Sequence, residues 1–98
     1  MKADPRLGLL GLAHRAGCVI NGEGQVLIVL QALTPVVVFL ASDAGENIRK
    51  KLIDKTRREN ATLVTDFDTD TLSAAIGKIN RKALAIVDPG FVKALKKY

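Results

Sequence analysis

The side chains that could perform acid–base, nucleophilic or metal chemistry are few in this sequence. It holds one histidine, His14, and one cysteine, Cys18. No carboxylate stands near His14 in the sequence to orient it as a general base. A metal site needs several His, Cys or carboxylate ligands, and these two residues alone do not make one. We predict a histidine at the surface or boundary of a helix and a small buried cysteine where a strand begins.

The acidic triplet Asp66, Asp68 and Asp70 matches the beginning of a calcium-binding loop. That loop also needs a glycine at its sixth position for the turn and a glutamate at its twelfth as bidentate ligand. Those positions hold Thr71 and Gly77. The pattern therefore fails as a metal site, and the acids are expected to cap the N-terminus of a helix.

A glycine pair, Gly22 and Gly24, lies between a short predicted strand and a predicted helix. With Asp43 further along the chain, it forms part of a dinucleotide-binding fingerprint. Leu27 occupies the third glycine position, so the fingerprint is incomplete and no cofactor is expected. The same glycines would let backbone amides approach a ligand closely, and Gln25 could both donate to and accept from a base edge.

A second loop, from Lys78 to Lys82, places three cations around the apolar Ile79. Cations can contact RNA phosphates, and an apolar side chain beside them can contact a base. This combination is typical of proteins that bind folded RNA with unstacked nucleotides. The alternative is that both this loop and the glycine turn are ordinary solvated loops.

The elements that must position these residues alternate between helix and strand, which predicts a compact α/β sandwich. The apolar run Val36 to Ala41 predicts a strand covered on both faces. Its carboxyl end passes into Ser42 and Asp43, and ligands of open α/β sheets bind beyond such ends. Other strands are expected at 18–20, 62–64 and 83–87. Helices are expected at 4–16, 23–33, 43–60 (capped by Ser42 or Asp43), 68–76 (stopped by Gly77) and 91–97, the last after a turn at 89–90.

Composition narrows the class of protein. Ninety-eight residues with 48% hydrophobic side chains suggest one domain, 1–98, with an aliphatic core. The formal charge of +5 lies entirely in the second half, because residues 1–48 carry three bases and four acids. A basic excess favours polyanions, chiefly nucleic acid. The single cysteine fits a reducing compartment, and neither an N-terminal signal nor a membrane-spanning stretch is visible. A cytoplasmic protein is expected.

Three segments in order have a familiar pattern: LGLAHRAGCVINGEGQ, VVVFLASDAGENIRKK and LSAAIGKINRKALAIVD. Together they resemble the L-seven-Ae family of kink-turn-binding ribosomal proteins, in particular its small bacterial, YlxQ-like members. The resemblance spans Leu7 to about Leu95. It implies a three-layer α-β-α sandwich with a mixed sheet of about four strands. It also implies binding to kink-turns, sharply bent RNA duplexes with sheared G·A pairs.

In that family a G-x-N-E-x-x-K motif at the start of the second helix contacts the G·A pairs. Gly22 stands at the glycine of the motif, Gly24 at its asparagine, Gln25 at its glutamate and Ile28 at its lysine. Gln25 can still hydrogen-bond to a guanine, but Gly24 offers no side chain and Ile28 no charge. The family's hydrophobic loop before the last strand corresponds to residues 78–81, which are more basic than apolar. The scaffold is retained and the specificity motif is eroded, which predicts weaker or differently specific RNA binding.

The first hypothesis is a non-enzymatic protein that binds structured RNA, associated with the ribosome or translation, without a small-molecule cofactor or a membrane partner. The residues expected to contact RNA are Gly22, Glu23, Gly24, Gln25, Lys78, Ile79, Asn80 and Arg81, with Asp43 supporting this edge and Arg15 and Arg49 neutralising phosphates. The alternative is a protein-interaction module that keeps the fold and has lost specific RNA recognition. An enzyme or nucleotide binder is the third class considered.

Overall fold

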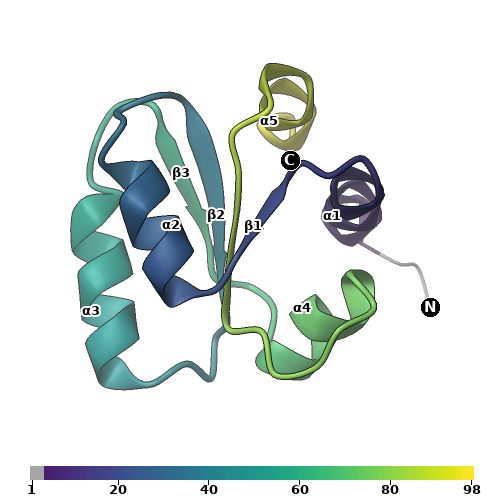
Figure 1. The fold of residues 1–98 in the computed structure, drawn as a ribbon, viewed down its shortest axis with the longest axis horizontal. Coiled ribbons are helices and arrows are strands. Elements are labelled where there is room, and N and C mark those ends of the chain that lie inside the picture. Colours follow the sequence, from purple (N-terminus) through teal and green to yellow (C-terminus); the bar gives the residue numbers. More distant parts are fainter. Residues whose placement is uncertain (1–3) are drawn as a thin grey trace.

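The computed structural model describes residues 4–98, and the expected lack of an N-terminal signal rests partly on residues 1–3, which lie outside this range. Nine elements alternate along the chain (Figure 1). They are α1 (Pro5–Arg15), β1 (Val19–Asn21), α2 (Glu23–Leu30), β2 (Val36–Leu40), α3 (Glu46–Lys55), β3 (Ala61–Val64), α4 (Thr69–Ala75), β4 (Ala83–Ile86) and α5 (Pro89–Leu95).

The four strands form one mixed sheet in the order β1-β4-β2-β3. β2 runs parallel to β3, whereas β4 runs antiparallel to both of its neighbours, β1 and β2. Figure 1 shows α2 and α3 on one face of the sheet and α1, α4 and α5 on the other. The predicted three-layer α-β-α sandwich with a mixed four-stranded sheet is therefore confirmed.

The core lies on both faces of β2, whose five residues are all buried. An interior strand covered by helices on both faces excludes water from every side chain, which explains its continuous apolar run. Phe39 is the largest fully buried side chain, and aliphatic residues supply most of the remaining core. No helix within residues 4–98 is long and apolar enough to span a membrane.

The helices with clear local signals occur where the sequence predicts them. Asp4 caps α1 by accepting from the backbone N–H of Arg6 at 2.9 Å. Asp68 caps α4 by accepting from the N–H of Thr71 at 2.8 Å, and hydrogen bonding to Thr71 lowers the pKa of the Asp68 carboxyl. Gly77 follows this helix with φ at +68°, a conformation that favours glycine at a helix end.

The predicted start and end of the third helix are both wrong. α3 begins at Glu46 after Gly45, and neither Ser42 nor Asp43 caps it. The turn through residues 42–45 separates these side chains from the helix, and Asp43 binds the start of α4 instead. The helix ends at Lys55, after which the helical bonding pattern breaks: the N–H of Arg57 donates to the Asp54 carbonyl, only three residues back, and the N–H of Arg58 donates to the Thr56 carbonyl.

Two further boundaries differ from the expectation. Pro89 and Gly90 belong to the first turn of α5, because Asp88 caps this helix by accepting from the N–H groups of Gly90 and Phe91. Proline is tolerated there since the first helical residues have no intrahelical acceptor for their N–H. α2 ends at Leu30, before Leu33, which adopts a φ of +59°.

Candidate nucleic-acid interface

Three segments that are distant in the sequence meet at one edge of the sheet. The N–H of Gly22 donates to the Ala83 carbonyl at 3.0 Å, which joins the turn before α2 to the start of β4. The N–H of Ala41 donates to the Lys82 carbonyl at 2.8 Å, which joins the end of β2 to the same segment. The glycine turn, the α4–β4 loop and the turn after β2 therefore lie side by side, at the lower edge of the sheet in Figure 1.

The turn before α2 depends on the backbone of Gly22. Its φ of +92° and ψ of 151° fall in a region that only glycine adopts readily. The described residues provide no side-chain cap for α2, so its first N–H groups stay available to a ligand. Gly24 and Gln25 are exposed in this first turn, and Glu23 lies 3.7 Å from the Lys51 ammonium on α3. The first turn of α2 therefore presents amide donors and one exposed carboxamide.

The α4–β4 loop presents its apolar tip to solvent. Ile79 is 84% exposed, and Lys78 and Asn80 beside it are also exposed. Asn80 adopts a φ of +57°, which asparagine tolerates better than most residues. Arg81 is half-buried, and its Nε has no hydrogen-bond partner among the described residues. Together with the exposed Lys82, the loop therefore carries three cations and one exposed aliphatic side chain close to the glycine turn.

A buried hydroxyl under this loop, that of Ser73 on α4, was not singled out from the sequence. Ser73 is 3% exposed; its Oγ donates to the Thr69 carbonyl at 2.6 Å and accepts from the backbone N–H of Arg81 at 2.8 Å. The N–H of Lys78 donates to the Ser73 carbonyl at 2.9 Å. Ser73 therefore fixes both ends of the loop. Nothing in the local sequence distinguishes it from a surface serine.

Asp43 supports the edge from behind the loop. Its Oδ1 accepts from the backbone N–H of Thr69 at 2.9 Å and from the Thr69 hydroxyl at 2.6 Å. The Lys82 ammonium lies 3.4 Å from the same hydroxyl. The hydrogen bond from the Thr69 hydroxyl is the main cause that lowers the pKa of the Asp43 carboxyl. The carboxylate thus links the turn after β2 to α4 and lies close to a loop cation.

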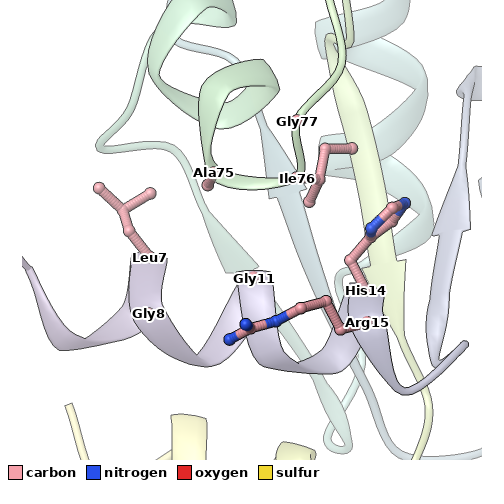
Figure 2. Close-up of a pocket in the computed structure, with 8 residues that line it drawn as sticks. All are labelled: Leu7, Gly8, Gly11, His14, Arg15, Ala75, Ile76 and Gly77. Atoms are coloured by element: carbon pink, nitrogen blue, oxygen red, sulfur yellow. The ribbon is translucent and has the colours of Figure 1, made fainter.

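The two other predicted arginines lie on different elements. Arg49 of α3 donates from Nη1 to the Ser42 carbonyl at 3.1 Å, so part of its guanidinium is already used within the protein. Arg15, at the end of α1, lines an open groove together with Gly77, the residue just before the loop. Figure 2 shows the His14 side chain directed toward Ile76 and Arg15 extended along α1. Arg15 therefore belongs to a neighbouring surface.

The acids and the cysteine have structural contacts. Asp66 pairs with Arg6 at 2.7 Å, whereas the prediction made it a helix cap together with Asp68. Within residues 4–98 no group of three or more His, Cys, Asp and Glu side chains is placed to hold a metal ion. Cys18 precedes β1 and is partly exposed, so its predicted burial is only partial.

The partial dinucleotide fingerprint lacks the strand arrangement that it needs. In a dinucleotide-binding unit, the two parallel strands that the glycine turn and its helix join lie directly next to each other in the sheet. Here β1 pairs antiparallel with β4, and β4 separates it from β2. The glycine turn is therefore not part of such a unit.

Comparison with known proteins places this chain among relatives. No family model matches it. It is 38% identical over 90 residues to the RNA-binding protein YlxQ of Enterococcus faecium, covering 92% of this chain and 86% of that protein. It is 34% identical over 87 residues to the RNA-binding protein YlxQ of Bacillus subtilis, covering 89% and 87%.

Solved structures agree with these sequence relatives. A protein of unknown function from Bacillus halodurans superposes with a TM-score of 0.85 at 37% identity, covering 94% of this chain and 93% of that one. A 15.5kD RNA-binding protein from Giardia lamblia superposes with a TM-score of 0.69 over 99% of this chain and 92% of that one; at 14% identity it shows a shared fold alone. The chain belongs to the YlxQ family.

Proposed function

We propose that this chain is a non-enzymatic, single-domain RNA-binding protein of the cytoplasm, associated with the ribosome or with translation. Its target is structured, kink-turn-like RNA. The RNA contacts are the turn before α2 and the α4–β4 loop. Both sequence relatives are named RNA-binding proteins, which supports RNA binding as the activity of this chain.

One observation carries the choice of this edge. The hydrogen bond from Gly22 N–H to the Ala83 carbonyl at 3.0 Å brings the glycine turn next to the segment that follows the loop. The free amides at the start of α2 and the Gln25 carboxamide can hydrogen-bond to base edges, and the exposed Ile79 can contact an unstacked base. Lys78 and Arg81 can neutralise the phosphates of the nucleotides that carry these bases. All the kinds of contact that a bent RNA requires are thus available within one edge.

Fluorescence anisotropy tests the proposal. The probe is a kink-turn RNA, and its control has Watson–Crick pairs in place of the G·A pairs, each measured at two salt concentrations. We expect the kink-turn RNA to bind at least about tenfold more tightly, because each recognised base pair is worth roughly 1–3 kcal/mol. Equal, strongly salt-dependent binding to both would leave only a generic phosphate-binding surface. No binding to either would refute the proposal.

A second candidate is a protein-interaction module, and the observation that favours it is Ile28. This side chain stands where the family motif has lysine and is 58% exposed on α2. An exposed isoleucine on the motif helix suits an apolar partner better than a phosphate. Pull-down with and without ribonuclease separates the two functions: protein partners that survive digestion favour the module, and partners lost on digestion favour RNA binding.

A further inference from the structure

An open groove of about 410 Å³ lies between α1 and α4, on the helical layer that contains α5. Its lining comes from both helices and from the residue just before the loop. Six of the lining residues are Gly8, Gly11, His14, Arg15, Ala75 and Gly77.

The two glycines on the α1 side of the groove have different roles. A Cβ on Gly11 would lie 2.9 Å from the Ala75 carbonyl oxygen, so this glycine is required where the two helices touch. A Cβ on Gly8 would meet nothing within 4 Å. Packing therefore gives no reason for a glycine at position 8. Helix stability gives none either, because glycine is a weaker helix former than alanine. Its effect is to leave the groove open there.

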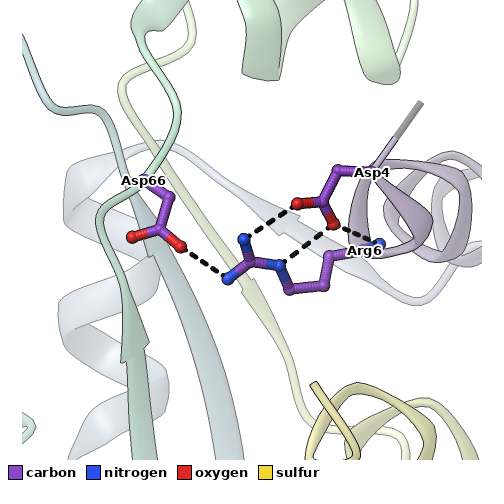
Figure 3. A network of polar contacts seen from close by, with 3 residues as sticks. All are labelled: Asp4, Arg6 and Asp66. Atoms are coloured by element: carbon purple, nitrogen blue, oxygen red, sulfur yellow. Dashed lines mark hydrogen bonds and ion pairs between the residues drawn. The ribbon is translucent and has the colours of Figure 1, made fainter. Parts of the chain in front are cut away.

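The groove is held in shape before any ligand arrives. The Arg6 guanidinium donates to both carboxylate oxygens of Asp4, at 3.1 and 2.9 Å, and pairs with Asp66 at 2.7 Å (Figure 3). It also lies 4.8 Å from the centre of the Phe67 ring. Hydrogen bonds to Asp4 raise the pKa of Arg6, so the guanidinium stays charged. This network fixes the start of α1 to the segment that leads into α4.

The wall of the groove carries side chains on which bases stack. Unpaired bases stack on aromatic rings, histidine and arginine. None of the described aromatic residues lines the groove: Phe39 is fully buried, Phe67 is covered by Arg6, and Phe91 and the exposed Tyr98 lie outside its lining. The groove is lined instead by His14, whose side chain is directed toward Ile76, and by Arg15, whose side chain extends back along α1 (Figure 2). Gly77, which lines the groove, is followed directly by Lys78, so the groove adjoins the start of the proposed RNA-binding loop.

From this adjacency and from the charge of Arg15, we propose that the RNA path extends from the loop into the α1–α4 groove. An unpaired nucleotide next to the one at Ile79 places its base over Gly8 and Gly11, stacked against His14. Arg15 contacts its phosphate. This inference rests on the proposed function, and it adds a second site for an unpaired nucleotide.

Two variants test the groove against matched controls. Gly8→Leu fills the groove without a steric clash at Cβ, and Ala32→Leu adds bulk at an exposed position at the opposite edge. Arg15→Gln removes one cation from the groove, and Lys93→Gln removes one from the exposed side of α5. Binding of the kink-turn RNA is measured by anisotropy, and 4-thiouridine placed at each unpaired position is cross-linked to locate the contact.

We expect Gly8→Leu to weaken binding by at least about fivefold, since the loss of one stacked base has an effect of this size or greater. Arg15→Gln should lower the salt slope by about one, and both controls should behave as wild type. A 4-thiouridine next to the position that cross-links to the loop should cross-link to α1. If both groove variants bind the RNA as tightly as wild type, while replacing Lys78 and Arg81 weakens binding, the nucleotide site in the groove is refuted and the proposed function stands. Unchanged binding in the groove and loop variants together would overturn the proposed function as well.

Discussion

Ser73→Ala is the substitution that best tests how the loop is held. The serine Oγ makes two short hydrogen bonds under the loop, to the Thr69 carbonyl at 2.6 Å and from the Arg81 N–H at 2.8 Å, besides a long contact to the Arg81 carbonyl at 3.4 Å. Losing the first costs little, because a helix carbonyl can keep its other acceptor interactions. Losing the second leaves a backbone N–H without its acceptor beside a site that is 3% exposed.

The expected loss in the free energy of unfolding is about 1–2 kcal/mol, in the lower part of the range for an unsatisfied buried donor, because Arg81 itself is half-buried. For a domain of this size, that corresponds to a fall in Tm of about 4–8 °C for each kcal/mol. RNA affinity should also fall, although Ser73 does not reach the surface, because the Arg81 end of the loop loses its anchor while the Lys78 end keeps its backbone bond to the Ser73 carbonyl.

Urea unfolding followed by circular dichroism measures the stability change, and hydrogen exchange measures protection of the Arg81 amide. Ser42→Ala is the matched control, because Ser42 is exposed at the same edge of the sheet. A Ser73→Ala variant as stable as the Ser42→Ala variant, with the Arg81 amide still protected, would refute the reasoning.

Three further predictions concern the same edge. Replacing Lys78 and Arg81 together with alanine should weaken RNA binding and reduce the slope of log K against log salt by about two, measured by anisotropy over a salt series. Asp43→Asn should flatten the loss of stability in acid: the pKa of Asp43 is lowered from 3.8, so its contribution is present above about pH 4 and disappears as the pH falls through the lowered value, measured by urea unfolding from pH 2 to 7. Gly22→Ala should destabilise the fold by about 1–3 kcal/mol, measured by thermal unfolding, because alanine is strained at a φ of +92°.

Two of these predictions have a control in the same chain. Alanine at Lys93 and Lys96 together removes two exposed cations from α5 and its C-cap and should leave the salt slope unchanged. Gly8→Ala should stabilise slightly, because its Cβ meets nothing within 4 Å. An unchanged slope in the loop variant, an acid limb that Asp43→Asn leaves as steep as wild type, or a Gly22→Ala variant as stable as wild type would contradict the corresponding prediction.

The sequence predicts well those elements whose signals are local. The run at Val36 marks a buried strand, Asp4 marks the start of α1, and Asp68 and Gly77 bound α4. Each signal lies within a few residues of the structure that it specifies. The family resemblance then predicts the layers and the mixed sheet, which periodicity alone does not order.

What the sequence misses depends on partners that are far away in the chain. Asp43 reads as a cap for the nearest helix, but its partner Thr69 lies 26 residues further on. Ser73 acquires its role only when the loop folds back onto α4. The sequence suggests that Arg49 is a free cation, but in the structure its guanidinium donates to the Ser42 carbonyl. Nothing in the local pattern distinguishes these side chains from ordinary exposed ones.

The central claim is that one edge of the sheet receives the RNA. Amide chemical-shift mapping with ¹⁵N-labelled protein and unlabelled kink-turn RNA tests it most directly. We predict that the largest shifts occur at Gly22, Gly24, Gln25 and residues 78–81, and that the exposed side of α5 shows none. Shifts centred on α5 or α3, or no shifts at a concentration where binding is saturated, would contradict the account.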